Sequence, residues 1–562
     1  MRLVLPAVSA VLALLVLTPL LGRGFVLNYD MVFAPDQSLL PDGLGLGSAL
    51  PRSVPADAVM SFATAPLPGD VVQKIVLLAA LFAGPLGAGR LVPTNSVAIR
   101  VVAAVWYGWS AYVAERLFMG HWPYVVTYAC LPWIAAAGLA VRRGEPKALP
   151  KLILACAPAV LTPTGGIIAA VLAVVCSGRR ELAVTVPVTV LLNMPWLLPS
   201  VLHPGGSLSS PDGVGAFAAR AENWGSPVTS VLGLGGIWNA EVVPGSRGMP
   251  LLPVITLLSV AVALVGLRSL APRWGLAPAR SFVVLGAIGV AIAVFGTLPG
   301  GGDVLAWAVS HVPGAGLLRD SQKWAAWWAL PLSLGFALGV EAAGKYLTNR
   351  TALVALAALL PLITMPDFAW AGLGRLEVVD YPADWSAVRT VLAADDGAGD
   401  VLALPMSAFR RFSWNGDRTQ LDPAPRFLPR TVVIDDVVYV GGRPVSGEDG
   451  RVATIRRAMA RGGDLGAFGI GWVLVEHGTP GSVDPGVLRG LREVWSGPWL
   501  TLYRVPGVIA PPPAGAPRLP VVAGDLGAVA VVASGLLWLL LPVGRFRRSS
   551  HSRTVEEQAC AH

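Results

Sequence analysis

The sequence is poor in charge and in cysteine, and each shortage excludes a class of protein. Only 14% of its 562 residues are charged and 54% are hydrophobic, whereas soluble globular proteins carry about 25% charged residues. The four cysteines include no Cys-x-x-Cys pair, which argues against a zinc cage or a redox dithiol of that kind. Segment 370–520 contains no cysteine, so it must fold without disulfides.

What the sequence has instead is a series of apolar runs, each about 20 residues long, the length of a helix that crosses a bilayer. Basic residues cluster in the short segments between these runs, as the positive-inside rule expects. The net charge of +8 is therefore explained by membrane topology, and we expect no nucleic-acid partner. The predicted spans are 3–21, 71–91, 97–114, 122–141, 182–202, 250–268, 281–298, 325–344, 351–366 and 526–543.

Two further apolar segments, 152–161 and 167–176, are too short to span, and TPTGG (162–166) separates them. As one kinked helix they would put the basic stretch SGRRE (177–181) outside and invert the charge pattern downstream. As two half-depth helices of a re-entrant hairpin, they keep that stretch on the cytoplasmic side. Non-helical backbone at such depth needs protein or water around it, so the hairpin predicts an internal cavity. The kinked helix remains the alternative.

Segment 370–520 has the pattern of a small globular domain. Helical spacing at 384–396 is followed by runs rich in β-branched residues, among them 400–405, 430–440 and 471–478. We therefore predict an extracytoplasmic α/β domain tethered at both ends by membrane helices.

The predicted fold is a polytopic α-helical protein of the plasma membrane, with about ten spans, one re-entrant hairpin and both termini in the cytoplasm. The predicted parts are a transmembrane domain (1–369), the extracytoplasmic α/β domain (370–520), a C-terminal transmembrane helix (521–544) and a basic cytoplasmic tail (545–562).

The first outer loop, 22–70, holds a candidate catalytic carboxylate. Asp30 follows the first predicted span by a few residues, where it would take a proton from an attacking hydroxyl as a general base. A solvated loop acid is the alternative. Asp57 and Arg52, farther along the loop, are weaker candidates for supporting roles and are typical of a loop surface.

A second polar group, Glu115, Arg116 and His121, is predicted on a short outer turn between two spans. Histidine titrates near neutral pH and binds phosphates or metals. The alternative is a Glu–Arg pair beside an interfacial aromatic belt. The spacing supports no metal ligand, and a divalent metal stays open only as a possible cofactor.

A third group lies in LLRDSQKW, at the start of the predicted span 325–344. Arg319 and Lys323 are four residues apart and would share one helical face. Two cations at a helix N-terminus oppose the helix dipole, and a bound anion would relieve that conflict. Asp320 and Gln322 are possible supporting residues, and a salt-bridged interfacial cap is the alternative.

An early acidic residue outside, half-depth helices and a C-terminal outer domain together resemble the GT-C glycosyltransferases. The stretches NYDMVF, GHWPYVVTYACLPW, TPTGG and LLRDSQKW resemble the membrane portion of actinobacterial arabinofuranosyltransferase-like proteins, over roughly residues 1–370. The resemblance implies transfer of a sugar, arabinofuranose or another pentose or hexose. The donor would be a polyprenyl-phosphate sugar, and the acceptor a cell-envelope glycan or glycolipid at the outer face of the bilayer.

The resemblance also implies roles for individual residues. Asp30 corresponds to the catalytic residue of the first outer loop, and the donor phosphate would be bound by Arg319, Lys323, Arg116 and His121. Unlike the better-known members, this chain has no adjacent acidic pair in that loop.

Two other functions stay open. A transporter of lipid-linked precursors is disfavoured, because ionisable residues are sparse within the spans and no inverted repeat is visible. A non-catalytic scaffold or glycan-binding protein of envelope assembly is compatible with the missing acidic pair.

Overall fold

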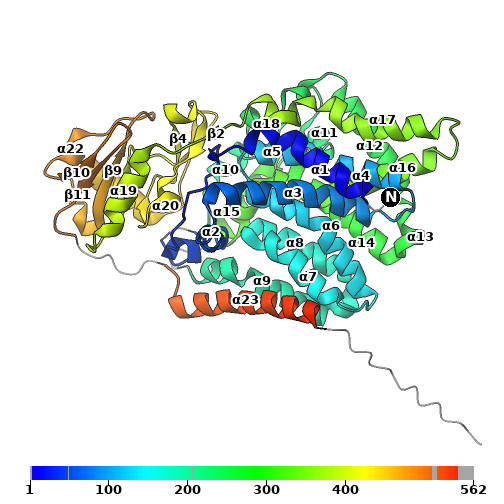
Figure 1. Ribbon diagram of the computed structural model, residues 1–562, viewed down its shortest axis with the longest axis horizontal. Coiled ribbons are helices and arrows are strands. Elements are labelled where there is room, and N and C mark those ends of the chain that lie inside the picture. The colour runs from blue at the N-terminus through cyan, green and yellow to red at the C-terminus, as the bar shows by residue number, and fades with distance from the viewer. Residues whose placement is uncertain (1–2, 49, 204–207, 509–514, 542–562) are drawn as a thin grey trace, which may run out of the picture.

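The computed structural model describes residues 3–48, 50–203, 208–508 and 515–541. It has a large helical part and a smaller part built on a β-sheet, which lies at one end of the helices (Figure 1). The basic tail predicted at 545–562 lies outside the described residues.

The long helices coincide with the predicted apolar runs. Among the described residues, eight helices are long and apolar enough to cross a membrane, and nine if the bent pair Arg350–Thr364 and Pro366–Leu373 is one span. The first predicted span is a shorter apolar helix, Val4–Leu20. The polytopic helical architecture is therefore confirmed, with fewer full-length helices than the ten runs suggested.

The membrane-spanning set is made of α3 (Gly69–Leu91), α4 (Val97–Gly108), α5 (Ala111–Phe118), α6 (Trp122–Arg142), α9 (Leu182–Leu202), α12 (Leu252–Leu267), α13 (Leu270–Trp274), α14 (Leu276–Phe295), α16 (Ala326–Ala343), α17 (Arg350–Thr364) and α23 (Arg518–Leu540), with α1 (Val4–Leu17) as the shorter first helix. Shorter helices in the connections of the helical part are α2 (Ala56–Thr64), α10 (Asp212–Ala216), α11 (Pro227–Leu232), α15 (Gly301–His311) and α18 (Ala369–Leu373).

A break between α4 and α5 sets the direction of α5, which carries Glu115 and Arg116. Trp109 leaves the helical conformation (φ −104°, ψ 67°), and its indole N–H donates to the backbone oxygen of Met365 at 2.9 Å. A Cβ on Gly108 would lie 2.4 Å from the ring of Pro85 in α3, so glycine permits this close helix approach.

The two short apolar segments form a helical hairpin of α7 (Ala148–Cys156), a 3-10 turn and α8 (Pro163–Ser177). Thr162 caps α8 by accepting from the N–H of Gly165, and Pro163 occupies the first turn. The hairpin returns to the side on which it began, because Gly178 lies against the Arg142 side chain at the end of α6.

The hairpin tip is packed against its neighbours, which corrects the expectation of a cavity there. Thr164 is 1% exposed. A Cβ on Gly165 would lie 2.5 Å from the Thr127 hydroxyl of α6, and one on Gly166 would lie 1.9 Å from the Asn193 side chain of α9. Small residues here permit close helix packing and do not open a chamber.

The sheet has the strand order β10-β11-β9-β3-β6. Strand β3 runs parallel to both β6 and β9, whereas β9, β11 and β10 form an antiparallel set. The strands are β3 (Asp400–Leu404), β6 (Val432–Val433), β9 (Ile470–Glu476), β10 (Arg492–Ser496) and β11 (Leu500–Arg504).

Helices cover both faces of this sheet, which explains the continuous apolar sequence of its central strands. In β3, Val401 joins the core beneath α19 (Ala383–Ala394), while the alternate residue Leu402 joins the core beneath α21 (Gly450–Ala460). Further elements of this region are α20 (Ala424–Phe427), α22 (Pro485–Leu488), β7 (Val438–Val440) and β8 (Arg443–Val445). A small α/β domain is therefore present in the C-terminal region, as predicted.

The first outer loop is joined to the α/β domain by main-chain hydrogen bonds. Strand β1 (Phe25–Val26) pairs with β2 (Val378–Val379). A few residues later, Tyr29 donates to the oxygen of Thr419 and accepts from the N–H of Leu421, both at 2.7 Å. These two partners belong to β5 (Thr419–Leu421), which forms a hairpin with β4 (Phe409–Arg411). The segment that precedes Asp30 is thus fixed by the domain.

Candidate active site

Asp30 is held at the contact between the helical part and the α/β domain. Its backbone N–H donates to the oxygen of Met119 at the end of α5, at 3.2 Å. Gly120, in the left-handed region (φ +73°), packs directly under this loop, because a Cβ there would lie 2.2 Å from the nitrogen of Met31. Only glycine fits this close approach.

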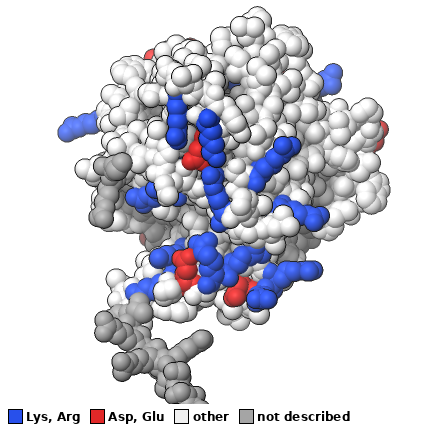
Figure 2. Space-filling model, turned by 90° about the vertical axis from the view of Figure 1, so that its right-hand side faces the viewer, with Lys and Arg blue, Asp and Glu red and all other residues white. Residues whose placement is uncertain are grey.

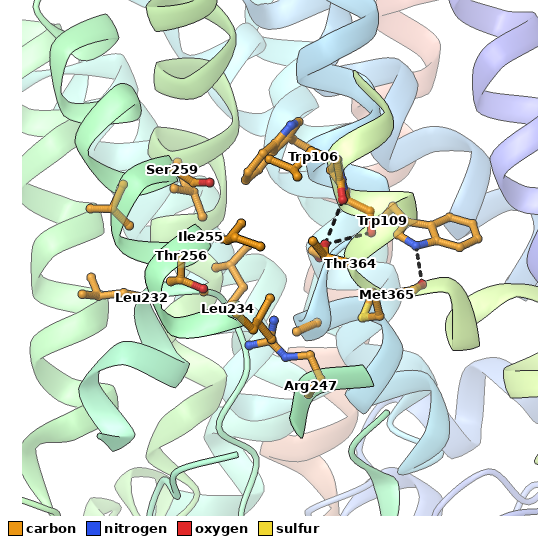
Figure 3. Close-up of a pocket in the computed structure, with 18 residues that line it drawn as sticks. Trp106, Trp109, Leu232, Leu234, Arg247, Ile255, Thr256, Ser259, Thr364 and Met365 are labelled. Atoms are coloured by element: carbon orange, nitrogen blue, oxygen red, sulfur yellow. Dashed lines mark hydrogen bonds between the residues drawn. The ribbon is translucent and has the colours of Figure 1, made fainter. Parts of the chain in front are cut away.

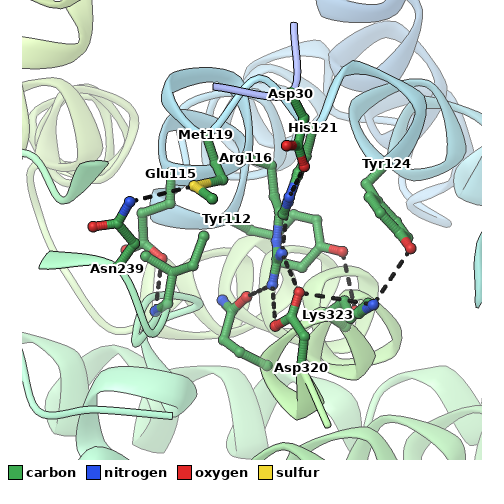
Figure 4. Close-up of polar contacts among 12 residues, drawn as sticks. Asp30, Tyr112, Glu115, Arg116, Met119, His121, Tyr124, Asn239, Asp320 and Lys323 are labelled. Carbon is green, nitrogen blue, oxygen red and sulfur yellow. Dashed lines mark hydrogen bonds and ion pairs between the residues drawn. The ribbon is translucent and has the colours of Figure 1, made fainter. Parts of the chain in front are cut away.

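Asp30 and His121 form a close pair, with 2.9 Å between Oδ2 and Nε2 (Figure 4). The other ring nitrogen, Nδ1, lies 2.9 Å from the NH1 group of Arg116. A guanidinium can only donate, so Nδ1 accepts and the proton of a neutral imidazole lies on Nε2, directed at Asp30. The Asp30 side chain is 39% exposed and that of His121 only 11%.

Arg116 is the buried centre of this group. Its NH1 group lies 2.9 Å from Oδ2 of Asp320 and its NH2 group 3.3 Å from Oδ1, a two-pronged pair. The NH2 group also donates to Gln322, whose own amide donates to the backbone oxygen of Gly235 at 3.1 Å. The Arg116 side chain has no exposed surface, so it positions its neighbours and does not face solvent.

Lys323 is held more loosely than Arg116. Its ammonium nitrogen lies 3.7 Å from Oδ2 of Asp320, 3.4 Å from the Tyr124 hydroxyl and 5.2 Å from the centre of that ring. Long contacts of this kind leave donor capacity available for a ligand. Burial opposes ionisation of Asp320, but Arg116 and Lys323 outweigh it and hold the pKa of that carboxyl below its ordinary range.

Four of the five predicted catalytic or phosphate-binding residues therefore lie in one network. They are Asp30, His121, Arg116 and Lys323, and the network also contains the supporting residues Asp320 and Gln322.

Arg319, the fifth of these residues, belongs to a different cluster, and its predicted helical face with Lys323 is wrong. Asp320 (φ −83°, ψ 74°) interrupts the helical path before a 3-10 turn over Ser321–Ala325, so the four-residue spacing does not align the two cations. Arg319 lies 2.9 Å from Glu448 of the α/β domain, and Arg52 pairs with the same carboxylate.

Asp57 is also a contact between the two parts, at 2.9 Å from Arg426. The three residues Arg319, Arg52 and Asp57 thus tie the helical part to the domain. No contact joins them to Asp30 among the hydrogen bonds and ion pairs of the described residues.

Glu115 and Arg116 are not on an outer turn, as the sequence suggested, but inside α5, where both are fully buried. The reason is that α5 continues the apolar span beyond the break at Trp109. Adjacent residues of a helix point in different directions, and Glu115 accepts from the N–H of Ile237 at 3.1 Å. It faces Glu222, which pairs with Arg247 at 2.7 Å.

A small cavity of about 70 Å³ borders this second buried group, and Arg247 forms part of its wall (Figure 3). The cavity is lined mainly by apolar side chains of α4, α12, α16 and α17, including Trp106 and Ile255, with hydroxyls from residues such as Thr256. It holds only a few waters, and its lining includes neither Asp30 nor Lys323.

Sequence reasoning missed two tyrosines of the site. Tyr124 contacts Lys323, and it stands three residues after His121, so the aromatic run that follows the histidine was an available signal. Tyr29, in the left-handed region (φ 45°), donates through its hydroxyl to Glu241. Burial, together with this hydrogen bond, raises the pKa of Tyr29 to about 12. No sequence signal links positions so far apart.

The described residues do not fit a divalent metal. They contain no group of three or more His, Cys, Asp or Glu side chains arranged to hold one. At Asp30 the neighbouring imidazole uses its second nitrogen for Arg116, so we derive no step through a metal.

Comparison with solved structures identifies the fold. Over 90% of its length, this chain superimposes on the cryo-EM structure of arabinofuranosyltransferase AftD from mycobacteria, with a TM-score of 0.54 and 17% identity. The chain has a GT-C fold. A structure of an AftD mutant gives a TM-score of 0.53 and 16% identity over 91% of the chain. The GT-C resemblance expected from the sequence is thereby confirmed at the level of fold.

The present chain spans 40% of the AftD chain. ArnT from Cupriavidus metallidurans, solved with undecaprenyl phosphate, aligns over 91% of this chain and 99% of its own at 14% identity, with a TM-score of only 0.35. No protein-family model matches the sequence, and the search of curated proteins found no match.

Within this GT-C fold, the Asp30 network lies where the helical part meets the α/β domain. Asp30 contacts Met119 of the helical part, and the preceding residue, Tyr29, contacts Thr419 of the domain.

Proposed function

We propose that this protein transfers a sugar from a polyprenyl-phosphate donor to a hydroxyl of a cell-envelope glycan or glycolipid at the outer face of the plasma membrane. The sugar is arabinofuranose or another pentose or hexose. The observation that carries the proposal is the network in which an accessible carboxylate, Asp30, and a loosely held ammonium, Lys323, are linked through His121, Arg116 and Asp320.

In this proposal Asp30 is the general base. The acceptor oxygen forms a bond to the anomeric carbon, while the bond from that carbon to the phosphate oxygen breaks. The acceptor proton passes to Asp30, whose exposed carboxylate oxygen is oriented by the Nε2–H of His121. Because the leaving phosphate gains negative charge, a cation fixed beside it lowers the barrier.

We assign the phosphate contact to Lys323 and not to Arg116 or Arg319. Arg116 is fully buried and already donates to Asp320, Gln322 and His121. Arg319 is paired with Glu448 at the domain contact. Lys323 keeps only long contacts, so a phosphate oxygen competes easily for its protons. Arg116 then acts as a positioning residue that fixes Asp320 and the imidazole.

The proposed topology places Asp30 and segment 370–520 outside and both termini in the cytoplasm. It is supported by the basic residues between the spans, which gather at the end of the helices away from the α/β domain (Figures 1 and 2). It puts the reaction on the side where envelope acceptors are found.

Sugar transfer by purified protein in proteoliposomes tests the proposal. A synthetic polyprenyl-phosphate pentose and a short glycan acceptor should give product, and Asp30→Asn should lower kcat at least about 100-fold, as expected for loss of a general base. Asp36→Asn is the matched control, because Asp36 is in the same loop and pairs with Arg389 at 3.0 Å, with 63% of its side chain exposed.

Two outcomes reject the proposal. If Asp30→Asn retains the wild-type rate, Asp30 is not the base. If the lipid crosses the bilayer without loss of its sugar, the protein is a transporter of lipid-linked precursors. Binding of the glycan without any product from a panel of pentose and hexose donors would instead identify a non-catalytic scaffold.

A further inference from the structure

A cleft of about 540 Å³ opens at the end of the helices away from the α/β domain. It lies among the ends of α4, α13, α16 and α17 and the loop that connects α3 to α4, and Figure 2 shows lysine and arginine side chains gathered on this face. The residues that line it are Pro93, Thr94, Asn95, Ser96, Arg100, Arg273, Glu341 and Arg350. None of them belongs to the Asp30 network.

Among the described residues, one of the three arginines in the cleft has its charge paired. Arg273 lies 2.9 Å from Glu341, and this carboxylate also accepts from the Thr94 hydroxyl. Arg100 donates through Nε to the backbone oxygen of Thr94 at 2.9 Å. Within the described part of the chain, the terminal nitrogens of Arg100 and the whole Arg350 guanidinium make no hydrogen bond or ion pair.

The cleft therefore contains three positive charges and one negative charge. Two guanidinium groups that share a cleft without an anionic partner repel each other, and a bound anion would remove that cost. Guanidinium groups bind phosphate oxygens in a two-pronged geometry. Arg100 and Arg350 therefore suit a phosphate group as the anion.

Exposed apolar side chains stand close along the chain to the residues that line the cleft. Tyr346 is 89% exposed and Leu347 is 51% exposed, both in the loop that leads to Arg350. Leu276, the first residue of α14, is 73% exposed. Tyrosine and apolar residues beside basic ones are typical of the level of the lipid headgroups, so a phosphate that reaches this cleft from the side arrives on a lipid.

We propose that this cleft binds the phosphate headgroup of an anionic phospholipid, in the leaflet that the positive-inside rule assigns to the cytoplasm. Arg100 and Arg350 contact the phosphate oxygens, and the acyl chains lie along the exposed apolar surface near Leu347 and Leu276. The Arg273–Glu341 pair forms a fixed wall of the site. This lipid is distinct from the donor, whose proposed site lies at the opposite end of the helices.

Native mass spectrometry of the full-length protein tests this assignment. The protein is released from nanodiscs that contain equal amounts of phosphatidylglycerol and phosphatidylcholine, and the retained lipids are counted. We expect phosphatidylglycerol to be retained preferentially, and Arg100→Gln with Arg350→Gln to weaken its binding by about tenfold or more. The control removes two exposed charges from the same basic side but outside the cleft, Arg179→Gln with Arg180→Gln, and should retain the lipid.

Three results would overturn the proposal. Equal loss in the cleft variant and the control would mean that the whole basic surface attracts lipid. No preference for phosphatidylglycerol over phosphatidylcholine would mean that there is no anionic site. Displacement of phosphatidylglycerol by millimolar inorganic phosphate, with the same dependence on Arg100 and Arg350, would identify a site for free phosphate. Because sugar transfer is not measured, failure here leaves the proposed function untouched.

Discussion

At the scale of single residues, accessibility divides the cations of the site into two roles. Arg116 has no exposed surface, and its NH1 and NH2 groups donate to Asp320, Gln322 and His121. Lys323 is 13% exposed with contacts of 3.4 Å and longer. The sequence could predict that both residue types suit a phosphate, but not that Asp320 would pair with a residue 204 positions away.

Lys323→Gln should impair donor binding more than folding. Its ion pair with Asp320 is long, so its loss costs less than about 1 kcal/mol of stability. Loss of a charge-assisted contact to the donor phosphate should raise KM for the polyprenyl-phosphate sugar about tenfold. Steady-state kinetics measure this change, with Lys345→Gln, just beyond the far end of α16, as the control. An unchanged KM would exclude Lys323 from the phosphate site.

Asp320→Asn should destabilise the protein at neutral pH by about 3 kcal/mol, because it leaves the buried Arg116 guanidinium without its ionic partner. The pKa of Asp320 in the folded protein is below its ordinary value of 3.8. The stabilising effect of the carboxylate is therefore present above that ordinary value and is lost as the pH falls toward the folded pKa.

Thermal unfolding at a series of pH values tests whether the stability that the Asp320 carboxylate contributes is lost as the pH falls. The wild type should lose stability as the pH falls below about 4, and the difference between wild type and Asp320→Asn should shrink over the same range. A difference that stays constant down to acid pH would show that the Asp320 carboxylate is not ionised in the folded protein.

At the scale of elements, the position of Asp30 depends on the β4–β5 hairpin. Besides the two main-chain bonds of Tyr29, the buried amide of Asn415, in the connection between β4 and β5, donates to the oxygen of Leu27 at 3.0 Å. The domain is thus part of the site and not only an appendage.

Asn415→Ala should loosen the Asp30 segment without unfolding the helical part. Loss of a buried hydrogen bond costs about 1–3 kcal/mol, and we expect it to appear locally. Amide hydrogen exchange at Tyr29 and Leu421 should become faster, while exchange in α6 stays the same and sugar transfer falls. Ser407→Ala, which removes a hydroxyl contact near β4, is the control. Unchanged exchange at Tyr29 would contradict this role of the hairpin.

Some helices and strands could be predicted from the sequence, and others could not. Apolar length was sufficient to predict the long helices, and a short run of apolar and β-branched residues was sufficient to predict β3, because burial determines both patterns. The prediction that Arg319 and Lys323 share a face assumed α-helical spacing. It is wrong because Ser321–Ala325 forms a 3-10 turn. The continuation of α5 beyond Trp109 likewise depends on tertiary contacts, such as the indole bond to Met365.

At the scale of the whole molecule, two groups of polar residues belong to opposite ends of the helices; Figure 1 shows the α/β domain at one end and α4, α13 and α16 reaching the other. One is the Asp30 network beside the α/β domain, which the ion pairs Arg319–Glu448 and Asp57–Arg426 hold in place. The other is the basic end with the cleft at Arg100. Cationic groups that could bind the phosphate of a donor lie at both ends. The proposed function requires that the donor bind at the Asp30 network.

The most direct test is a cryo-EM structure of the protein in nanodiscs with a polyprenyl phosphate bound. Our prediction is phosphate density within hydrogen-bond distance of the Lys323 ammonium, on the side of the network that faces Asp30 and His121. Phosphate density beside Arg319, or only in the cleft at Arg100 and Arg350, with the Asp30 network unchanged, would contradict it.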